Sequence, residues 1–392
     1  MSSNFKRWTP AVVVPVLVAS AIIGSKVSAS ADVALPDKSA SQVLQLINTN
    51  PNISFSGQVT KVANLGLPNI NLIPTISQST VDQIAKNAPK GMSDFIPKAT
   101  VQDSLTTAIG FLSGTQKANV FVDGLTEARV QILDPMSERD LVRNGSDLWY
   151  YDAAKQTVTH HALTAAELAM ENQGLPADAA TLPFDINSPA SVADYFISQA
   201  TPTTTFTVGR ATRVAGEAAY TLTLTPKTAD SLVASVTLAI DAAHGLPLSV
   251  TVNAVGQSDP AFQVSFDSID FSAPSASVFA FTPPAGATVS DVNAPATKSD
   301  ENSSEGSWSA ADQAQINELT KQGWSAVAQI PAAQANQVLS TIKSNPLYTD
   351  LTHAVSGGRV FHTALLNVLI TDDGRVFAGA VTEAKLLEAA AK

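Results

Sequence analysis

The sequence contains no cysteine. That absence excludes disulfides, thiolate metal sites, a cysteine nucleophile and lipid attachment through a lipobox cysteine. Charged residues make up only 15% of the 392 residues, and the net charge is −11 with no basic run. An acidic chain of this kind is poorly suited to binding nucleic acid. Its length is sufficient for two domains that each bury a core.

Motifs for catalysis and metal binding are also missing. There is no Gly-x-Ser-x-Gly elbow, phosphate-binding loop, GxGxxG or His-Glu-x-x-His sequence. His160 and His161 are adjacent on a predicted strand, so they point to opposite faces and cannot chelate one ion. The acids of Asp372-Asp373-Gly374 lack the alternating spacing of a calcium loop. We therefore expect no enzymatic activity, no metal and no cofactor.

The first 31 residues have the pattern of an export signal. A basic pair, Lys6-Arg7, precedes the apolar run Ala11–Gly24, which is short for a membrane span. Small residues then favour cleavage between Ala31 and Asp32, with Ala29 as the second choice of cleavage site. An uncleaved anchor is the alternative. In both cases we expect the body of the protein outside the cytoplasm.

Most of the chain has the period-two alternation of β-strands. After a strand at Ile53–Ala63, five short runs are separated by turn residues: Lys117–Val122, Glu127–Leu133, Arg139–Arg143, Asp147–Tyr151 and Thr157–Ala162. More strands are expected within Thr204–Phe281. Threonine-rich outer faces indicate a twisted antiparallel sheet with one face toward water. We predict a mainly β (α+β) fold, a curved antiparallel half-open β-barrel.

Short amphipathic helices interrupt the strands at Ser39–Asn50, Thr164–Asn172 and Ser188–Gln199. The second and third lie mid-sequence, where they can cover the sheet as a helical lid. We expect a half-barrel over residues 32–289, a polar linker over 290–307 and a small C-terminal α+β domain over 308–392. That domain is predicted to contain the following elements: helices near Ala311–Gln322, Ala332–Ser344 and Thr382–Lys392, a strand near Trp324–Ile330, and a hairpin of Arg359–Thr371 with Arg375–Ala380.

The stretch Asp147–Leu163 (DLWYYDAAKQTVTHHAL) concentrates aromatic residues on one predicted hairpin. Trp149 and Tyr151 share one face of their strand, where they either pack across strands in a β-core or line an apolar cavity. Under the cavity interpretation, the candidate wall residues are Val120, Val122, Val130, Ile132, Trp149, Tyr151, Tyr220, Leu222 and Leu224. The candidate lid residues are Leu168, Val192, Tyr195 and Phe196.

Several segments, in order, carry a resemblance to a known family. They are SFSGQVTKVANLGLPNI (54–70), ERDLVRNGSDLWYYDAAKQTVTHHAL (138–163), RVAGEAAYTLTLTP (213–226), IDAAHGLPLSVTV (240–252) and SIDFSAPSASVFAFTPPAGATV (268–289). Over about residues 40–290 the chain resembles the actinobacterial LolA-like proteins of the LolA/LolB/RseB superfamily. Residues 357–391 resemble the C-terminal tail of the same proteins.

The resemblance implies a half-open β-barrel with helices as a lid over an apolar cavity. In the carriers of the family that cavity holds lipoprotein acyl chains. In its RseB-like sensors a related surface responds to envelope lipids or proteins and touches an anti-sigma factor. We therefore expect an exported or membrane-tethered, non-enzymatic binder of lipids or acylated lipoproteins near a membrane surface. The alternative is a regulatory sensor that binds an envelope protein. An insertion around 64–115 and the extra C-terminal domain depart from LolA itself.

Overall fold

The computed structural model describes most of the body of the chain. The described residues are 33–47, 50, 52–66, 113–134, 137–165, 168, 189–291, 319, 321–332, 335, 339–340, 342–343 and 347–392. The predicted signal segment, including Ala31 and Asp32, lies outside these residues. So do most of the predicted linker and most of the helices predicted at Thr164–Asn172 and Ala311–Gln322.

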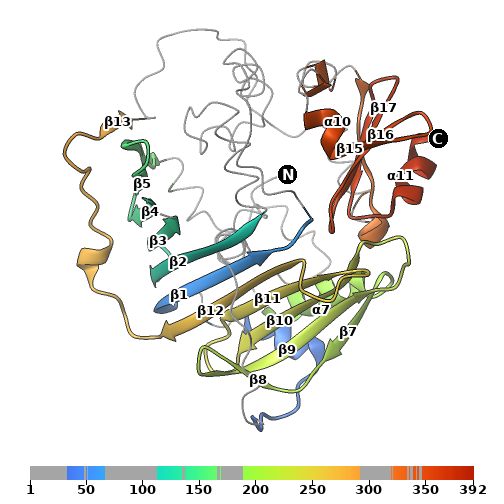
Figure 1. Cartoon of the computed structure of the whole chain (residues 1–392). Coiled ribbons are helices and arrows are strands. Elements are labelled where there is room, and N and C mark those ends of the chain that lie inside the picture. Colours follow the sequence, from blue (N-terminus) through green and yellow to red (C-terminus); the bar gives the residue numbers. More distant parts are fainter. Residues whose placement is uncertain are drawn as a thin grey trace.

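One open sheet dominates the described residues, with thirteen strands among them (Figure 1). Its strand order is β13-β6-β5-β4-β3-β2-β1-β12-β11-β10-β9-β7, with β8 pairing beside β9. The strands are β1 (Ser54–Ala63), β2 (Gly114–Asp123), β3 (Glu127–Asp134), β4 (Ser137–Asn144), β5 (Asp147–Asp152), β6 (Thr157–Ala162), β7 (Thr204–Val208), β8 (Thr212–Val214), β9 (Glu217–Pro226), β10 (Val233–Asp241), β11 (Pro247–Ala254), β12 (Phe262–Asp270) and β13 (Thr288–Asp291). All pairs are antiparallel except β13 with β6, so the predicted mainly β, antiparallel fold is confirmed.

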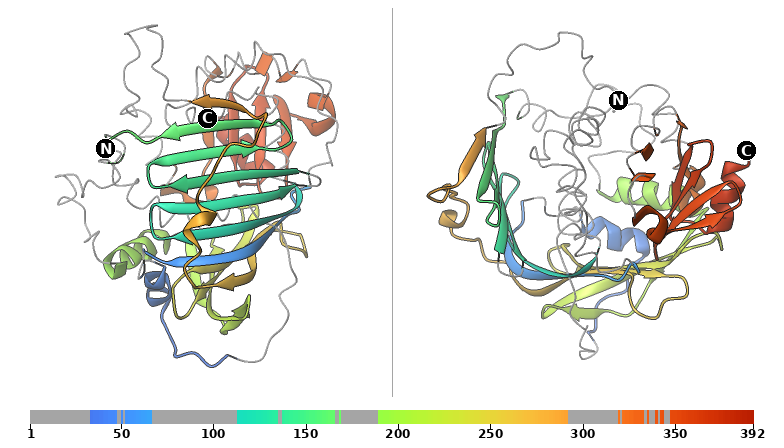
Figure 2. Two further views of the ribbon diagram at one scale, coloured as in Figure 1. Left: turned by 90° about the vertical axis from the view of Figure 1, so that its left-hand side faces the viewer. Right: turned by 45° about the horizontal axis from the view of Figure 1, so that its top comes forward.

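The sheet curves like a trough, with β2–β6 rising from a floor that contains β1 and β12 (Figure 2). Side chains of paired residues lie on the same face, so the register traces each face across the strands. We call the concave side the inner face; it carries Val120, Val130 and Leu222. The convex side is the outer face. Along the floor, the inner face forms a core in which the rings of Phe55 and Phe266 meet edge to face at 5.8 Å.

Two helices cover the β7–β10 end of the inner face (Figure 2). Helix α3 (Ala40–Leu46) begins at Ser39 with a capping box, and its buried Val43 packs against Tyr220 and Leu222. Helix α7 (Pro189–Ala200) lies against α3, and the Ser41 hydroxyl donates a hydrogen bond to the carboxylate of Asp194. Amphipathic patterning predicted both helices; Val43 of α3 faces the sheet, and the ring of Phe196 on α7 lies 6.2 Å from that of Phe206 on β7.

A segment that we call the strap, residues 271–287, leaves β12 and crosses the outer face toward the far edge of the sheet (Figure 2, left). It includes the 3-10 turn η2 (Ala276–Val278) and the buried Phe279. Arg129 on β3 donates a hydrogen bond from Nη1 to the carbonyl oxygen of Val278 at 3.1 Å. The strap leads into β13, which pairs in parallel with β6. Residues near 290, predicted as linker, therefore begin as a strand.

The C-terminal residues form a second sheet with strand order β14-β18-β17-β16-β15. Its elements are η3 (Gly323–Ser325), β14 (Ala328–Ile330), α10 (Leu347–Leu351), β15 (Thr352–Val355), β16 (Gly358–His362), β17 (Asn367–Thr371), β18 (Val376–Gly379) and α11 (Glu383–Ala390). Helix α11 packs Leu386 onto Val360 and Phe377 of this sheet. Main-chain hydrogen bonds join it to the loop after β9, from Leu232 N to Ala380 O (2.9 Å) and from Thr382 N to Asp230 O (2.7 Å).

One predicted element of this sheet needs correction. Arg359–Thr371, predicted as a single strand, is β16 and β17 with a turn between them. The hydroxyl of Thr363 accepts a hydrogen bond from the amide of Leu366 at 2.9 Å and closes that turn. A threonine side chain that bonds to the backbone offers an alternative to the strand ladder, and apolar periodicity does not show it. No helix among the described residues has the length and apolarity to cross a membrane.

The close packing around Gly57, at the centre of the sheet, leads to a prediction about stability. A Cβ at this position would lie 2.9 Å from Cδ1 of Phe266 and would also collide with the carbonyl oxygen of Ser268. We expect Gly57→Ala to lower the free energy of unfolding by about 1–3 kcal/mol, measured by urea denaturation. Ser56→Ala, one residue earlier on the opposite face, is the control. Equal stability of the two variants would contradict the close packing described here.

Candidate functional site

A row of apolar side chains crosses the inner face of β2–β5, and on β4 it lies between Arg139 and Arg143 of the same face. Val120 on β2 pairs with Val130 on β3, which pairs with Leu141 on β4, which pairs with Tyr150 on β5. The neighbouring pair Ala118–Ile132 and the neighbouring Val122 lie on the same face. The register thus brings together four of the predicted wall residues: Val120, Val122, Val130 and Ile132.

Burial on this surface decreases from the floor toward the rim. Val120 is only 2% exposed, Val130 and Ile132 are half-buried, and Leu141 is 39% exposed. Leu148 and Tyr150 on β5 are half-buried as well. Apolar side chains that remain accessible on a concave surface are typical of a site for an apolar ligand.

The other end of the inner face is filled by protein. Tyr220 and Leu222, predicted as wall residues, are 5% and 0% exposed beneath α3. The hydroxyl of Tyr220 donates to the carbonyl oxygen of Pro36 at 3.0 Å, and Leu224 joins the same cluster. These three residues share the face of Val130, but they hold the helices to the sheet.

Three of the four predicted lid residues lie on α7, at the margin of this covered end. On α7, Val192 and Tyr195 are half-buried, while Phe196 is 48% exposed and meets the ring of Phe206 at 6.2 Å. Leu168 is half-buried and helical, and the residues on both sides of it lie outside the described part of the chain. Helix α7 therefore offers one exposed aromatic ring, that of Phe196, beside the inner face.

Trp149 and Tyr151 lie on the outer face, which corrects their predicted grouping with the other wall residues. Trp149 pairs with Val142, which in turn pairs with Arg129, whereas Leu148 and Tyr150 alternate onto the inner face. The ring of Phe281 in the strap lies 5.4 Å from Trp149 and 6.1 Å from Tyr151. These aromatics pack the strap onto the outer face of the sheet.

His160 belongs to the same group of rings on the outer face, with Trp149, Tyr151 and Phe281. Its ring stacks on Trp149 with centroids 3.9 Å apart, and its Nε2 lies 2.8 Å from a carboxylate oxygen of Asp147. Its Nδ1 lies 3.5 Å from Asp291 of β13. His161 pairs with Leu148 and points to the inner face, so the predicted separation of the two histidines is confirmed. Across the described chain, no group of three or more acidic or histidine side chains could hold a metal.

Polar groups gather at one end of the inner face. Arg139 on β4 forms a two-bond ion pair with Asp134 on β3, at 2.7 and 3.0 Å. Asp152, which pairs with Arg139 across the strands, is 8% exposed. Burial raises the pKa of the Tyr150 phenol at the edge of this group. The inner face therefore has a polar end beside its apolar centre.

Lys61 is a functional candidate that the sequence analysis missed. It is fully buried on β1 and pairs with Val264 of β12 on the inner face. Its Nζ donates to the carbonyl oxygen of Ser113 at 3.4 Å. Burial lowers the pKa of this amine from 10.5 to about 8. The sequence does carry a signal for it. Lys61 lies two residues from both Val59 and Ala63 on the predicted strand, so the period-two alternation of side chains places all three on the buried face.

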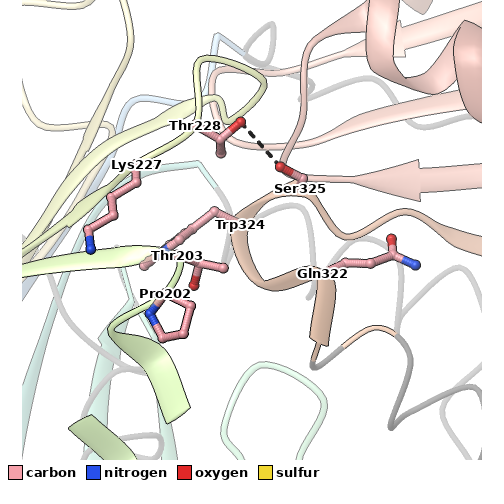
Figure 3. A pocket seen from close by; sticks show the side chains of 7 residues that line it. All are labelled: Pro202, Thr203, Lys227, Thr228, Gln322, Trp324 and Ser325. Carbon is pink, nitrogen blue, oxygen red and sulfur yellow. Dashed lines mark hydrogen bonds between the residues drawn. The ribbon is translucent and has the colours of Figure 1, made fainter. Parts of the chain in front are cut away.

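A small pocket lies where the second sheet meets the large one (Figure 3). It measures about 140 Å³, and its lining includes Thr203, Lys227, Gln322 and Trp324. The indole Nε1 of Trp324 donates to the hydroxyl of Thr204 at 2.7 Å. The Nζ of Lys227 donates to the carbonyl oxygen of Thr201 at 2.6 Å, so this cation is engaged within the protein. The pocket belongs to the junction and is too small for an acyl chain.

Comparisons with known proteins match no family model and no curated protein. Solved structures that align with the chain include MucB, at 15% identity and a TM-score of 0.33, over 62% of this chain and 62% of the MucB chain. The MucA/MucB complex of Pseudomonas aeruginosa aligns at 14% identity and 0.39, over 89% and 96%. A LolA superfamily protein from Nitrosomonas europaea aligns at 12% identity and 0.21, over 62% and 99%.

From the contacts of Phe281 with Trp149 and Tyr151 we predict that this ring anchors the strap to the outer face. Phe281→Ala removes the ring that contacts Trp149 and Tyr151 without changing the sheet itself. We expect amide hydrogen exchange at residues 288–291 to accelerate roughly tenfold, because an aromatic contact is worth about 0.5–1.5 kcal/mol. The amides of β11 serve as the internal control and should exchange as in the wild type. Unchanged exchange at 288–291 would show that the ring does not anchor the strap.

The buried amine of Lys61 predicts a pH dependence of stability. Between pH of about 8 and 10.5, the unfolded chain keeps the Lys61 proton while the folded chain releases it. The free energy of unfolding of the wild type should therefore rise with pH in this window, relative to Lys61→Met. Urea midpoints of both proteins at pH 7.5 and pH 10 measure the difference. A difference that stays constant would contradict the lowered pKa.

Proposed function

We propose that this chain is an exported, non-enzymatic binder or carrier of lipids or lipoprotein acyl chains. The observation that supports it is the accessible apolar inner face of β3–β5, with Val130, Leu141 and Tyr150 in one cross-strand row. Half-buried to exposed apolar side chains on a concave surface offer an acyl chain an environment like that of a bilayer. At the β7–β10 end of the same face, the protein's own helices already cover the apolar side chains.

The mechanism is sequestration from water. Each methylene of a ligand that is buried contributes about 0.8 kcal/mol, so a partly covered acyl chain binds with useful affinity. Helix α7, with Phe196 exposed at the margin of the covered end, is the proposed lid, which would have to move toward β3–β5 to cover the acyl chain. The helix can move without breaking the sheet ladder, since side-chain contacts such as the Ser41–Asp194 bond attach it to α3.

The predicted export signal at residues 1–31 and the LolA-like segments support placing the protein on the extracytoplasmic side of a membrane. There it would take an acylated lipoprotein or a lipid as its partner. The family resemblance also implies a sensor role, in which an envelope regulatory protein is the partner. The two roles differ in what the inner face holds, so a ligand-binding experiment distinguishes them.

Two leucines of similar exposure allow a matched test. Leu141 is 39% exposed on the inner face, and Leu133 is 36% exposed on the outer face. We expect Leu141→Glu to weaken binding of a fluorescent fatty acid about tenfold or more, because a charge replaces apolar contact area. Leu133→Glu should bind like the wild type. Fluorescence titration of the purified proteins measures all three.

Two results would overturn the proposal. One is a wild-type protein that carries no co-purified lipid by mass spectrometry and takes up no fluorescent fatty acid. The other is equal loss of binding in both glutamate variants, which would mean that binding does not occur on the inner face. A protein that binds no lipid but captures an envelope regulatory protein would support the sensor role instead.

A further inference from the structure

Strand β7 forms one edge of the large sheet (Figure 1). It pairs with β9, and no strand of the described chain lies on its other side. Main-chain hydrogen bonds continue this ladder beyond both ends of β7. Lys227 N donates to Thr203 O at 2.9 Å, and Gly209 N donates to Thr221 O at 3.0 Å. These two bonds determine which residues of β7 are bonded to β9.

The phase of this ladder leaves two residues of β7 with unbonded main-chain groups. Opposed residues of an antiparallel pair alternate between hydrogen-bonded and non-bonded pairs. Thr205 and Thr207 are in phase with the flanking bonds, so the N–H and C=O groups of Phe206 and Val208 point away from the sheet. No residue of the described chain bonds to these four groups. Main-chain groups spaced in this way are what an added β-strand binds.

The sequence of β7, TTFTV, has no feature that protects an edge from pairing. Protected edges carry charged side chains, prolines or bulges. Strand β7 contains no charge and no proline, and its register with β9 runs without a shift. In the second sheet, by contrast, the guanidinium of Arg359 donates to the carbonyl oxygen of Thr352 on the edge strand β15 at 2.6 Å. The β7 edge is therefore open to another chain.

An added strand would also meet apolar surface. The side chains of Phe206 and Val208 lie on the inner face, in the cluster beneath α3. The ring of Phe196 on α7 lies 6.2 Å from that of Phe206 and is 48% exposed. Thr205 and Thr207 on the outer face are exposed. A strand with apolar side chains on the Phe196 side and polar ones on the other therefore matches this edge.

The charges around the edge favour an acidic partner. Residues 201–216 contain Arg210 and Arg213 and no acid, although the whole chain has a net charge of −11. Arg210 lies just after β7 and is exposed, and Lys227 is exposed at the other end of the ladder. The exposed acid of α7, Asp194, is engaged by a hydroxyl of α3. Acidic side chains at both ends of an added strand would complement these cations.

The free part of the edge is short and bounded at both ends. Trp324 donates its indole N–H to the hydroxyl of Thr204 at 2.7 Å, so the second sheet lies at one end. At the other end the chain turns and pairs with β9 again as β8. A few residues of pairing bury much less surface than a stable protein dimer needs. The edge therefore suits a single extended segment better than a second copy of this chain.

We propose that β7 is the docking site for an extended, acidic segment of a partner protein, which adds to the large sheet as a new edge strand. Main-chain hydrogen bonds to Phe206 and Val208 hold the segment in place. Its apolar side chains cover the ring of Phe196, and its acids lie near Arg210 and Lys227. This site is separate from the apolar row of β3–β5, so it does not depend on lipid binding.

A fluorescent peptide with two aspartates at each end and alternating valine and threonine between them tests strand addition. Its symmetric ends allow it to pair in either direction. We expect the peptide to slow amide hydrogen exchange at Phe206 and Val208 about tenfold. Thr205 and Thr207, which already bond to β9, are the internal control. Unchanged exchange at Phe206 and Val208 would overturn the proposal, as would protection that grows with protein concentration when no peptide is present, which would indicate a second copy.

Methylation of alternate amide nitrogens in the peptide tests main-chain pairing directly. It removes the N–H groups on one side of the extended peptide. Methylation in one phase should abolish binding, measured by fluorescence anisotropy, and methylation in the other phase should leave it nearly unchanged, because only one side of a strand faces β7. Equal loss in both phases would overturn the proposed strand addition.

Charge reversal tests the acidic character of the partner. Arg210→Glu should weaken binding of the aspartate peptide roughly fivefold and strengthen binding of the same peptide with lysine ends. Lys155→Glu, in the exposed turn between β5 and β6 near the far edge of the sheet, is the matched control and should bind both peptides like the wild type. An Arg210→Glu protein that folds, by circular dichroism, and binds both peptides like the wild type would overturn the acidic class of partner.

Discussion

Antiparallel pairing from β6 through β1 to β7 keeps the side chains of all these strands in phase. Because paired residues lie on one face, the register carries the apolar row of Val120 across to Tyr150 at one end of the inner face, and it places Leu222 on the same face at the other end. A slip of one residue in any strand would move its apolar side chains from the inner to the outer face. The covered floor, the accessible rim and the helices all depend on this common register.

The two ends of the inner face differ because only one end has protein packed on it. Val43 of α3 takes up the apolar surface of Tyr220 and Leu222, which therefore contribute to stability. On β3–β5 the same kind of surface remains accessible at Leu141. One continuous face thus serves as hydrophobic core at one end and, under the proposed function, as the lipid-binding surface at the other.

Local patterns in the sequence predicted the strands and the helices α3 and α7, since alternation and amphipathicity are properties of neighbouring residues. They could not assign Trp149 to a face of the sheet. Which side chains of different strands share a face depends on the pairing register, and every turn between β1 and β5 affects that register. They also could not reveal its contact with Phe281, since more than a hundred residues separate the two rings along the chain. Alternation did assign Lys61 to the core side of its strand, but the residues that bury it on β12 are distant in sequence.

The strap has a mechanical consequence for the trough. It is fastened along the convex side at β3 by Arg129, at β5 by the rings around Phe281 and at β6 by β13. The convex surface of a sheet lengthens when the sheet curls more tightly and shortens when it flattens. A tie fixed at several points on that side therefore resists further curling and tolerates flattening. The strap acts as a brace that keeps the half-barrel from closing on itself, so that the width of its opening is set from outside.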